Sequence, residues 1–482
     1  MSTQMNFQPV LLWTDLLLFV LLGAAVWAAF HVRSNAPLRE AWRKVGKRPT
    51  GMAAATVLLV FVCIGVLDSL HYRPVLPPVH SSTNGADSGV KPAAPIYSTE
   101  VLSVLDALLE PLRARTEKTY SAPFAAQLYQ REAMELPDGR QVRAYPRLEH
   151  GAAHLDEPSA ERGADIAQRL VMGAGQAVWV WMALFVMLAT FVYRGSGLRW
   201  GEVAVAMLSG RTVLAWRSAL VTLAVILLLV GICLELAPLY HVLGTDKVGQ
   251  DVLYLSLKSV RTALVIGTLT TLVMMPFAVA LGIAAGYLGG WVDDAVQYVY
   301  TVLNAIPGVL LIAAAVLMMQ VVIDTHPEWF DTAAERSDAR LLALCFILGM
   351  TSWTGLARLL RGETLKLREL EYVQAARAFG VKTPAILHRH ILPNVMHIVL
   401  IALVMDFSGL VLAEAVLSYV GIGVDPTTIS FGTMINMARA ELAREPMVWW
   451  SLAAAFCFMF VLVLAANLFA DVVRDAFDPR RS

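Results

Sequence analysis

Long apolar stretches alternate with polar loops along most of this chain of 482 residues. About 20 apolar residues cross the hydrocarbon core of a bilayer as a helix, and nine stretches are long enough. They lie near residues 10–31, 51–70, 172–193, 217–240, 260–287, 294–322, 340–361, 395–420 and 447–471. The pattern therefore predicts an all-α polytopic membrane protein with nine spans.

One polar segment between two of these stretches, residues 367–393, has the pattern of two short helices joined by a turn. The first helix has one apolar face, made of residues spaced i, i+3, i+4 and i+7: Tyr372, Ala375, Ala376 and Phe379. Gly380 follows, where a left-handed residue would end the helix. Thr383 and Pro384 predict the N-cap and first turn of the second helix, and Pro393 predicts its end. The segment must therefore act in water while being tied to two spans.

Composition agrees with a membrane protein. Hydrophobic residues make up 57% of the chain and the mean hydropathy is +0.60, which is too apolar for a soluble globule of this length. The 38 basic residues balance the 38 acidic residues, so no basic excess suggests a nucleic-acid partner. All four cysteines lie in apolar stretches, which argues against disulfides and zinc ligation.

The distribution of basic residues predicts the orientation. Six of them crowd residues 33–48, while the first nine residues carry no charge. By the positive-inside rule, the loop after the first span is cytoplasmic and the N-terminus is external. Alternation then places residues 71–171 outside, and it places both the 367–393 segment and the C-terminus in the cytoplasm.

Residues 71–171 predict a small external domain. A linker rich in Pro, Ser and Gly follows Pro74. Tyr97 to Arg115 predicts a helix that Thr99 could cap, and Arg140 to Arg147 predicts a strand. We therefore divide the chain into an N-terminal pair of spans, an external α(+β) domain, a third span with a cytoplasmic linker and a C-terminal membrane domain: 1–70, 71–171, 172–212 and 213–482.

The 367–393 segment also carries a recognisable motif. Gln374-Ala-Ala, then Gly380, then Ile391-Leu392-Pro393 resembles the Glu-Ala-Ala loop of bacterial ABC importer permeases. In that family the paired helices fit a cleft on the ATPase subunit and carry its closure into the membrane. Gln374 replaces the leading Glu of the family, which implies weaker or altered pairing. An ordinary amphipathic surface helix is the alternative interpretation of this segment.

Further motifs follow in the order of the same family. From about residue 213 the chain resembles one permease subunit of the dipeptide/oligopeptide/nickel ABC importers. The matching segments are Leu243 to Val252, Gly286 to Asp294, Ala305 to Pro307, Leu412 to Val424 and Asp471 to Arg480. Gln250 replaces an Arg of the family, which puts in doubt any ion pair made there.

The resemblance implies the architecture and the partners. It implies a core of five helices plus a tethering helix, preceded here by three extra spans. It implies a second related permease subunit in a heterodimer, two ATPases that bind ATP and Mg, an external solute-binding protein and the bacterial inner membrane. This chain would bind no cofactor itself. The coupling loop would comprise Glu371, Tyr372, Gln374, Ala375, Ala376, Phe379, Gly380, Ile391, Leu392 and Pro393.

Small residues and a proline within the spans suggest packing and bending. Gly282, Gly286 and Gly290 repeat every four residues, which lets two helices approach closely in lipid, although any one of them could merely be tolerated. Pro307 removes a helical hydrogen bond, which allows a kink beside a solute path or a purely structural bend.

Four acidic residues lie in or near apolar spans. Asp406 and Glu414 are eight residues apart, so they share roughly one helix face within a span where charge is costly. They would line the path or pair across a subunit interface, and we favour the interface over substrate contact. The alternative without a functional role is a carboxylate that is protonated or hydrogen-bonded between helices. Asp15 and Glu235 lie nearer span ends and are interpreted as ordinary interfacial residues.

The chain lacks the motifs of an enzyme. No phosphate-binding Gly-rich loop, nucleophile elbow or zinc-ligand spacing occurs, and His150 and His154 lack the glutamate of a metalloprotease helix. We therefore expect no catalytic or metal site, and we expect import of dipeptides or oligopeptides driven by another polypeptide. Nickel chelates, oligosaccharides or antimicrobial peptides are alternative cargoes. A non-transporting membrane scaffold or sensor is the alternative of a different class.

Overall fold

The computed structural model describes residues 7–76, 97–135, 141–196, 199–330 and 332–477. Within these ranges nine helical segments are long and apolar enough to cross a membrane, which confirms the predicted number. They contain α1 (Trp13–Ser34), α3 (Pro49–Asp68), α6 (Pro158–Ser196), α8 (Trp216–Leu236), α9 (Val252–Leu288), α11 (Gly308–Thr325), α12 (Ala333–Ser352) with α13 (Thr354–Arg368), α16 (Leu392–Val420) with the turn before it, and α18 (Trp450–Phe477).

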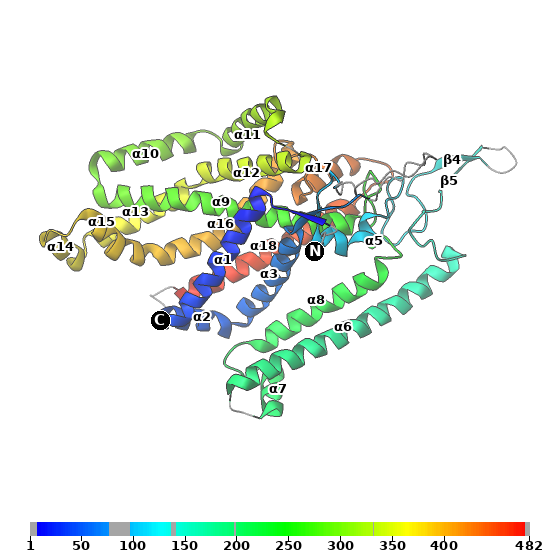
Figure 1. Cartoon of the computed structure of the whole chain (residues 1–482), viewed down its shortest axis with the longest axis horizontal. Coiled ribbons are helices and arrows are strands. Elements are labelled where there is room, and N and C mark those ends of the chain that lie inside the picture. Colours follow the sequence, from blue (N-terminus) through cyan, green and yellow to red (C-terminus); the bar gives the residue numbers. More distant parts are fainter. Residues whose placement is uncertain (1–6, 77–96, 136–140, 197–198, 331, 478–482) are drawn as a thin grey trace, which may run out of the picture.

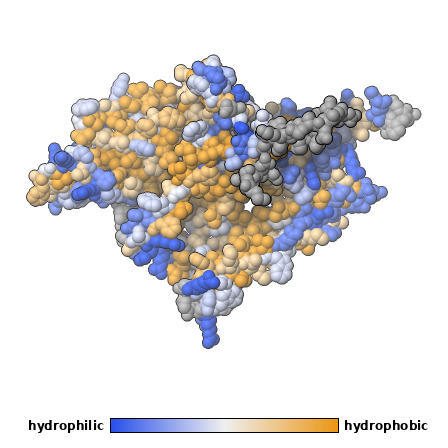
Figure 2. All heavy atoms as spheres, in the orientation of Figure 1, coloured by the Kyte–Doolittle hydropathy of each residue, from blue (hydrophilic) through white to orange (hydrophobic). Residues whose placement is uncertain are grey.

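The long helices run between two ends of the molecule (Figure 1). One end, here called the α14 end, carries α2 (Ala36–Lys47), α14 (Glu371–Ala378) and the C-terminal end of α18. The opposite end, called the β4 end, carries strands β4 (Glu132–Glu135) and β5 (Gln141–Ala144). Hydrophobic residues cover the region between them, and hydrophilic residues gather at the projecting parts (Figure 2). This distribution is typical of a protein that crosses a bilayer.

The central element is α9, which contacts α13, α12, α16 and α3. Its 37 residues include many that are fully buried, such as Val260, Ile266 and Ala278. Among the extra spans, α3 packs directly on α9 and α18, and α1 packs on α12 and α9. α6 lies at the periphery and packs on α8, which in turn packs on α3. Gly173 and Gly231 bring the backbones of α6 and α8 close together. The boundaries of the four predicted units stay predictions.

One predicted span is wrong. The stretch 294–322 was expected to form a single helix kinked at Pro307, but it forms α10 (Gly290–Ala305) and α11 as separate helices. Ile306 is extended at φ −88° and ψ 132°, and Pro307 precedes α11 at φ −55° and ψ 116°. Proline has no N–H and disfavours the helical conformation in the residue before it, so the helix breaks.

The helix predicted from Tyr97 to Arg115 is also wrong. It is replaced by strand β3 (Leu102–Ser103) and two short helices, α4 (Val104–Leu108) and α5 (Glu110–Arg113). Ser103, not Thr99, is the N-cap: its Oγ accepts a hydrogen bond of 3.1 Å from the backbone N–H of Asp106. Pro111 stands at the start of α5, where its missing N–H is tolerated.

Two small sheets complete the fold. Strand β2 (His71–Pro74) pairs antiparallel with β1 (Phe7–Val10) on one side and with β3 on the other. The strand predicted at residues 140–147 is found in part as β5, which pairs antiparallel with β4. Most of the predicted linker after Pro74 lies outside the described residues, as do Pro479 and Arg480.

Candidate functional site

The first helix of the 367–393 segment and its turn form as predicted. α14 ends at Ala378, and Gly380 adopts φ +74°, a conformation that residues with a Cβ rarely take. The N–H of Gly380 donates to the carbonyl of Arg377 at 3.0 Å, and the N–H of Val381 donates to the carbonyl of Ala376 at 3.1 Å. These two hydrogen bonds form a Schellman motif, which closes the helix and reverses the chain.

The apolar face predicted for α14 points away from the molecule. Phe379 is 88% exposed and Tyr372 is 43% exposed, while Val373 is buried at 2%. Val373 packs in one hydrophobic cluster with residues of α9, α13 and α16, so it anchors the helix. Ala375 is exposed and Ala376 is half-buried. Tyr372 and Phe379 therefore form an aromatic surface in which Phe379 is left uncovered by the described chain, while the Tyr372 hydroxyl accepts a hydrogen bond from Asn394 at 3.2 Å.

The second helix departs from the prediction. α15 (Thr383–Ile386) has Lys382, not Thr383, as its N-cap, and Pro384 lies in its first turn. The helix does not end at Pro393; it continues through a π-helical turn, Leu387–Ile391, directly into α16. A wider π turn accommodates a residue without an N–H, and Pro393 can therefore stand in the first turn of α16. Leu392 begins that helix, and buried Ile391 ties the turn to the core.

The structure suggests a local role for Gln374. Its Nε2 donates to the backbone carbonyl of Glu369 at 3.2 Å and contacts the carboxylate of the same residue at 3.4 Å. A glutamate at position 374 would bring two carboxylates together instead. Glu371, at the start of α14, is exposed. A hollow of about 770 Å³ lies beside Gln374, lined partly by Arg368 and Arg377.

Two of the three predicted packing glycines lie at a close helix contact. A Cβ built on Gly282 would lie 2.7 Å from the carbonyl oxygen of Ala357, and one on Gly286 would lie 2.7 Å from that of Arg361. Both neighbours belong to α13, so small residues hold α9 against it. The prediction fails for Gly290: no atom lies within 4 Å of its Cβ position, and its φ of +53° serves the turn between α9 and α10.

The two predicted carboxylates of α16 have different surroundings. Glu414 is buried at 2%, and its Oε1 accepts hydrogen bonds from Ser418 at 2.7 Å and Ser430 at 2.9 Å. It therefore links α16 to the start of α17 (Phe431–Glu441) within this chain. Asp406 is half-buried near the middle of α16 and has no hydrogen-bond or ion-pair partner among the described residues. The two carboxylates do not act as a pair.

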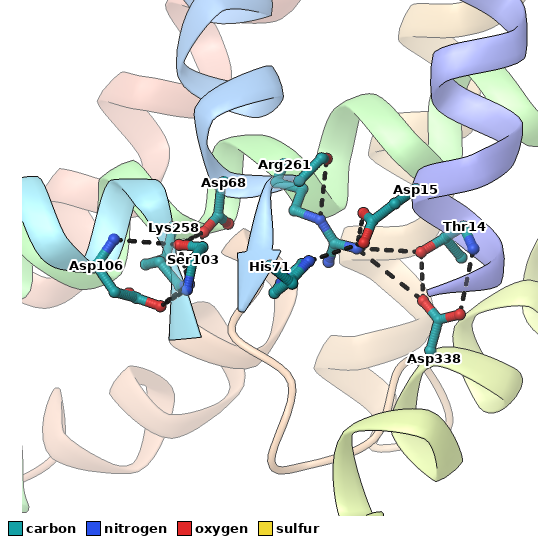
Figure 3. Close-up of polar contacts among 10 residues, drawn as sticks. Thr14, Asp15, Asp68, His71, Ser103, Asp106, Lys258, Arg261 and Asp338 are labelled. Carbon is teal, nitrogen blue, oxygen red and sulfur yellow. Dashed lines mark hydrogen bonds and ion pairs between the residues drawn. The ribbon is translucent and has the colours of Figure 1, made fainter. Parts of the chain in front are cut away.

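A buried ionic network at the β4 side of the bundle was not predicted (Figure 3). Arg261 of α9 donates to Asp15 of α1 at 2.6 Å and lies 4.0 Å from Asp338 of α12. His71 Nδ1 lies 2.7 Å from the other oxygen of Asp15. Asp15 is fully buried, so its interpretation as an ordinary interfacial residue is wrong. Glu235 is half-buried and accepts a hydrogen bond from Gln176 at 2.5 Å.

A second part of the network also joins an extra span to α9. Lys258 lies one turn before Arg261 and donates to Asp68 of α3 at 2.6 Å and to Asp106 of α4 at 3.0 Å. Burial favours a raised pKa for Asp106, but the Lys258 charge and the backbone hydrogen bond of Ser103 outweigh it and lower the pKa. Lys258 and Arg261, basic residues at the start of the predicted span 260–287, were the signal that could have pointed to a buried partner.

The loop before α9 is clamped to residues 117–151. His241 is buried, with Nδ1 2.8 Å from Asp251 and Nε2 3.3 Å from Glu117. Glu117 also accepts hydrogen bonds from the backbone N–H groups of residues 149, 150 and 151. Burial works to lower the pKa of His241, but both carboxylates raise it to about 9. Burial works to raise the pKa of Glu117, but His241 and the backbone donors lower it to about 2.

The remaining residues singled out in the sequence have structural partners or exposed positions. Asp251 caps α9 by accepting from the N–H of Leu253 at 2.8 Å, while Gln250 is exposed. His154 Nε2 lies 3.0 Å from Asp165. Among the described residues, no group of three or more His, Cys, Asp or Glu side chains could hold a metal ion.

Comparison with known proteins gives consistent matches. Residues 278–482 match the family described as binding-protein-dependent transport system inner membrane component. The oligopeptide transport system permease protein OppC of Mycobacterium tuberculosis is 33% identical over 239 residues, which cover 50% of this chain and 76% of that protein. The glutathione transport system permease protein GsiD of Pectobacterium atrosepticum is 34% identical over 242 residues, covering 50% of this chain and 73% of that protein.

Two further matches are more limited. The dipeptide transport system permease protein DppC of Lactococcus lactis subsp. cremoris is 30% identical over 242 residues, covering 50% of this chain and 64% of that protein. Among solved structures, the inward-facing MetNI methionine ABC transporter gives a TM-score of 0.35 at 15% identity, covering 46% of this chain and 96% of that chain. Each of these three curated relatives matches half of this chain.

Proposed function

The chain belongs to the binding-protein-dependent transport system inner membrane components of peptide ABC importers, and we propose that it imports dipeptides or oligopeptides as one permease subunit. Relatives named for oligopeptide, dipeptide and glutathione transport support a short peptide as the cargo. Membership makes the chain a transport subunit rather than an enzyme. ATP and Mg would be bound by separate ATPase subunits.

The observation that carries this proposal is the aromatic surface of α14. Phe379 and Tyr372 are exposed on a short helix at one end of the bundle, beside a turn that the left-handed Gly380 allows. An apolar surface of this kind at the end of a bundle is typical of a protein contact. We assign it to a cytoplasmic ATPase subunit, which places the α14 end in the cytoplasm.

Movement of α14 would reach the spans through its buried anchor. Val373 shares a hydrophobic cluster with Met274 and Ala278 of α9, and with Leu360 of α13. The close contact of Gly282 and Gly286 joins the same two helices. Packed interiors transmit displacements as rigid bodies because they contain little free volume. ATP-driven closure of the ATPases would thus shift α9 and α13 relative to a second permease subunit, as alternating access requires.

The solute path would run between the two permease subunits. Asp406 supports this, because a carboxylate in the middle of an apolar helix, with no partner among the described residues, needs water or a charged partner. The break at Pro307 separates α10 from α11, so these helices can move independently. An external solute-binding protein would deliver the peptide at the β4 end.

The test is ATP-driven uptake by the complete transporter in vesicles. Replacing Gly380 by Val forces a β-branched residue into a left-handed conformation, which costs at least about 1–2 kcal/mol and distorts the turn. Gly380→Asn is the matched control, because Asn tolerates this conformation. We expect Gly380→Val to abolish uptake of labelled peptide while still inserting in the membrane, and Gly380→Asn to retain uptake.

Equal uptake by both variants would contradict the coupling role of α14. Loss of uptake in both, with ATP hydrolysis still stimulated by peptide and binding protein, would also contradict it. Transport of the peptide without added ATPase subunits would refute the importer assignment itself.

A further inference from the structure

A strongly basic surface at the α14 end takes no part in the coupling scheme. It lies on α2, which connects α1 to α3. One side of α2 is apolar and is made of Leu38, Ala41, Trp42 and Val45. The other side carries Arg39, Arg43, Lys44 and Lys47, and Arg48 follows at the end of the helix. Residues 36–48 thus hold five basic residues and one carboxylate, Glu40.

The apolar side of α2 is fixed against the end of α18. The ring of Trp42 lies 6.5 Å from that of Phe469 and 5.7 Å from that of Phe477, measured between centroids. Val45 is buried against Val472 in the same contact. With its apolar side held in this way, α2 must present its basic side outward. Arg39, Arg43, Lys44, Lys47 and Arg48 are all exposed.

A second basic segment joins the C-terminal end of α2. The N–H of Ala215 donates to the carbonyl of Gly46 at 2.8 Å, which connects α2 to the loop before α8. Arg211 in this loop and Arg217 at the start of α8 are exposed. The span α1 ends at this level, and the spans α3 and α8 begin there. The basic residues therefore lie where a bilayer surface would pass.

These cations lack counter-charges among the described residues. Neither the five basic residues of 36–48 nor Arg211 and Arg217 form an ion pair in the described parts of the molecule. Lys258, Arg261 and Arg361, by contrast, each pair with an aspartate. An amphipathic helix with unpaired basic residues at the level of the bilayer surface attracts anionic lipid headgroups.

We propose that the basic side of α2, with Arg48, binds the phosphate groups of anionic phospholipids of the phosphatidylglycerol class. Arginine and lysine side chains donate several hydrogen bonds to phosphate oxygens, and their charge is neutralised on binding. Trp42, at the apolar side of the helix, occupies the interfacial level that tryptophan prefers. The lipid thus anchors α1 and α3 beside α18. These two extra spans precede the segment that matches the family.

The test compares two variants of the full-length purified chain in mild detergent. The first replaces Arg39, Arg43, Lys44 and Lys47 by Gln, which keeps helix propensity and removes four charges. The matched control replaces four cations nearer the other end of the molecule, the half-buried Arg115 and the exposed Arg131, Arg143 and Lys247. Native mass spectrometry counts the bound molecules after an equimolar mixture of phosphatidylglycerol and phosphatidylcholine is added.

We expect the unmodified chain and the control to retain at least about tenfold more phosphatidylglycerol, because each basic residue near an anionic surface contributes about fivefold. The α2 variant should retain the two lipids about equally. The preference of the unmodified chain should also fall as salt is raised.

An unchanged preference in the α2 variant would overturn the proposal, as would an equal loss in the control. Displacement of phosphatidylglycerol by excess inorganic phosphate would show a site for a free anion instead. A preference that does not respond to salt would exclude recognition by charge.

Discussion

The contact between α9 and α13 predicts opposite effects of alanine substitution at Gly286 of α9 and at two glycines of α13. A Cβ at Gly286 would lie 2.7 Å from both the carbonyl oxygen of Arg361 and the Cβ of Thr364. Ordinary contacts of a Cβ begin near 3.4 Å, so Gly286→Ala requires the two helices to separate. Overpacking of this kind costs about 1–3 kcal/mol, against about 1 kcal/mol gained by replacing Gly with Ala in a helix.

The matched controls lie on α13 itself. Gly355 and Gly362 have no atom within 4 Å of their Cβ positions, so alanine there gains helix propensity without a clash. We therefore expect Gly286→Ala to lower the free energy of unfolding by up to about 2 kcal/mol. Gly355→Ala and Gly362→Ala should leave it unchanged or raise it by up to about 1 kcal/mol.

The assay is unfolding of the purified chain in mixed micelles with increasing SDS, followed by circular dichroism. ATP-driven uptake by the complete transporter is a second measurement. Separation of α9 from α13 should reduce uptake in Gly286→Ala more than in Gly355→Ala. If all three variants shift the unfolding midpoint equally and in the same direction, the close contact does not hold these helices together.

Two further predictions concern the connections of α9. Because the pKa of His241 is about 9, above its ordinary value of 6.5, the clamp to residues 117–151 should be intact below about pH 6.5 and weaken as pH rises through about 9. Limited proteolysis of the 117–151 region should therefore accelerate above pH 9, and His241→Gln should accelerate it already at neutral pH; a flat pH profile would contradict the clamp. Arg261→Met leaves Asp15 without its cation and should destabilise the chain by about 3–5 kcal/mol in the SDS assay. Combining it with Asp15→Leu should recover part of that loss, and no recovery would show that the two side chains are not coupled.

Local chemistry made the turn of the 367–393 segment predictable. Gly380 after a helical repeat indicated a left-handed helix end, and the structure has one. The sequence did not show whether the apolar face of α14 points into the core or outward. Tyr372 and Phe379 at helical spacing are compatible with either direction. Val373, a single residue between them, decides the matter through contacts with helices that are distant in sequence.

The polar interior of the bundle could not be derived from periodicity. Asp15 and Arg261 are 246 residues apart and look like residues at span ends when each is considered alone. Only the packing of α1 against α9 brings them together. Ser103 replaces Thr99 as a cap for a local reason, because the Asp106 carboxylate three residues later accepts a hydrogen bond from the Ser103 N–H.

The central claim is that the exposed aromatic surface of α14 contacts the ATPase subunit. The most direct measurement places a photoreactive phenylalanine at position 379 in the assembled transporter, with the same residue at Tyr145, nearer the other end, as the control. We predict a cross-link from position 379 to the ATPase subunit whose yield changes with ATP, and none from position 145. A cross-link to the ATPase from position 145, or none from position 379, would contradict the account.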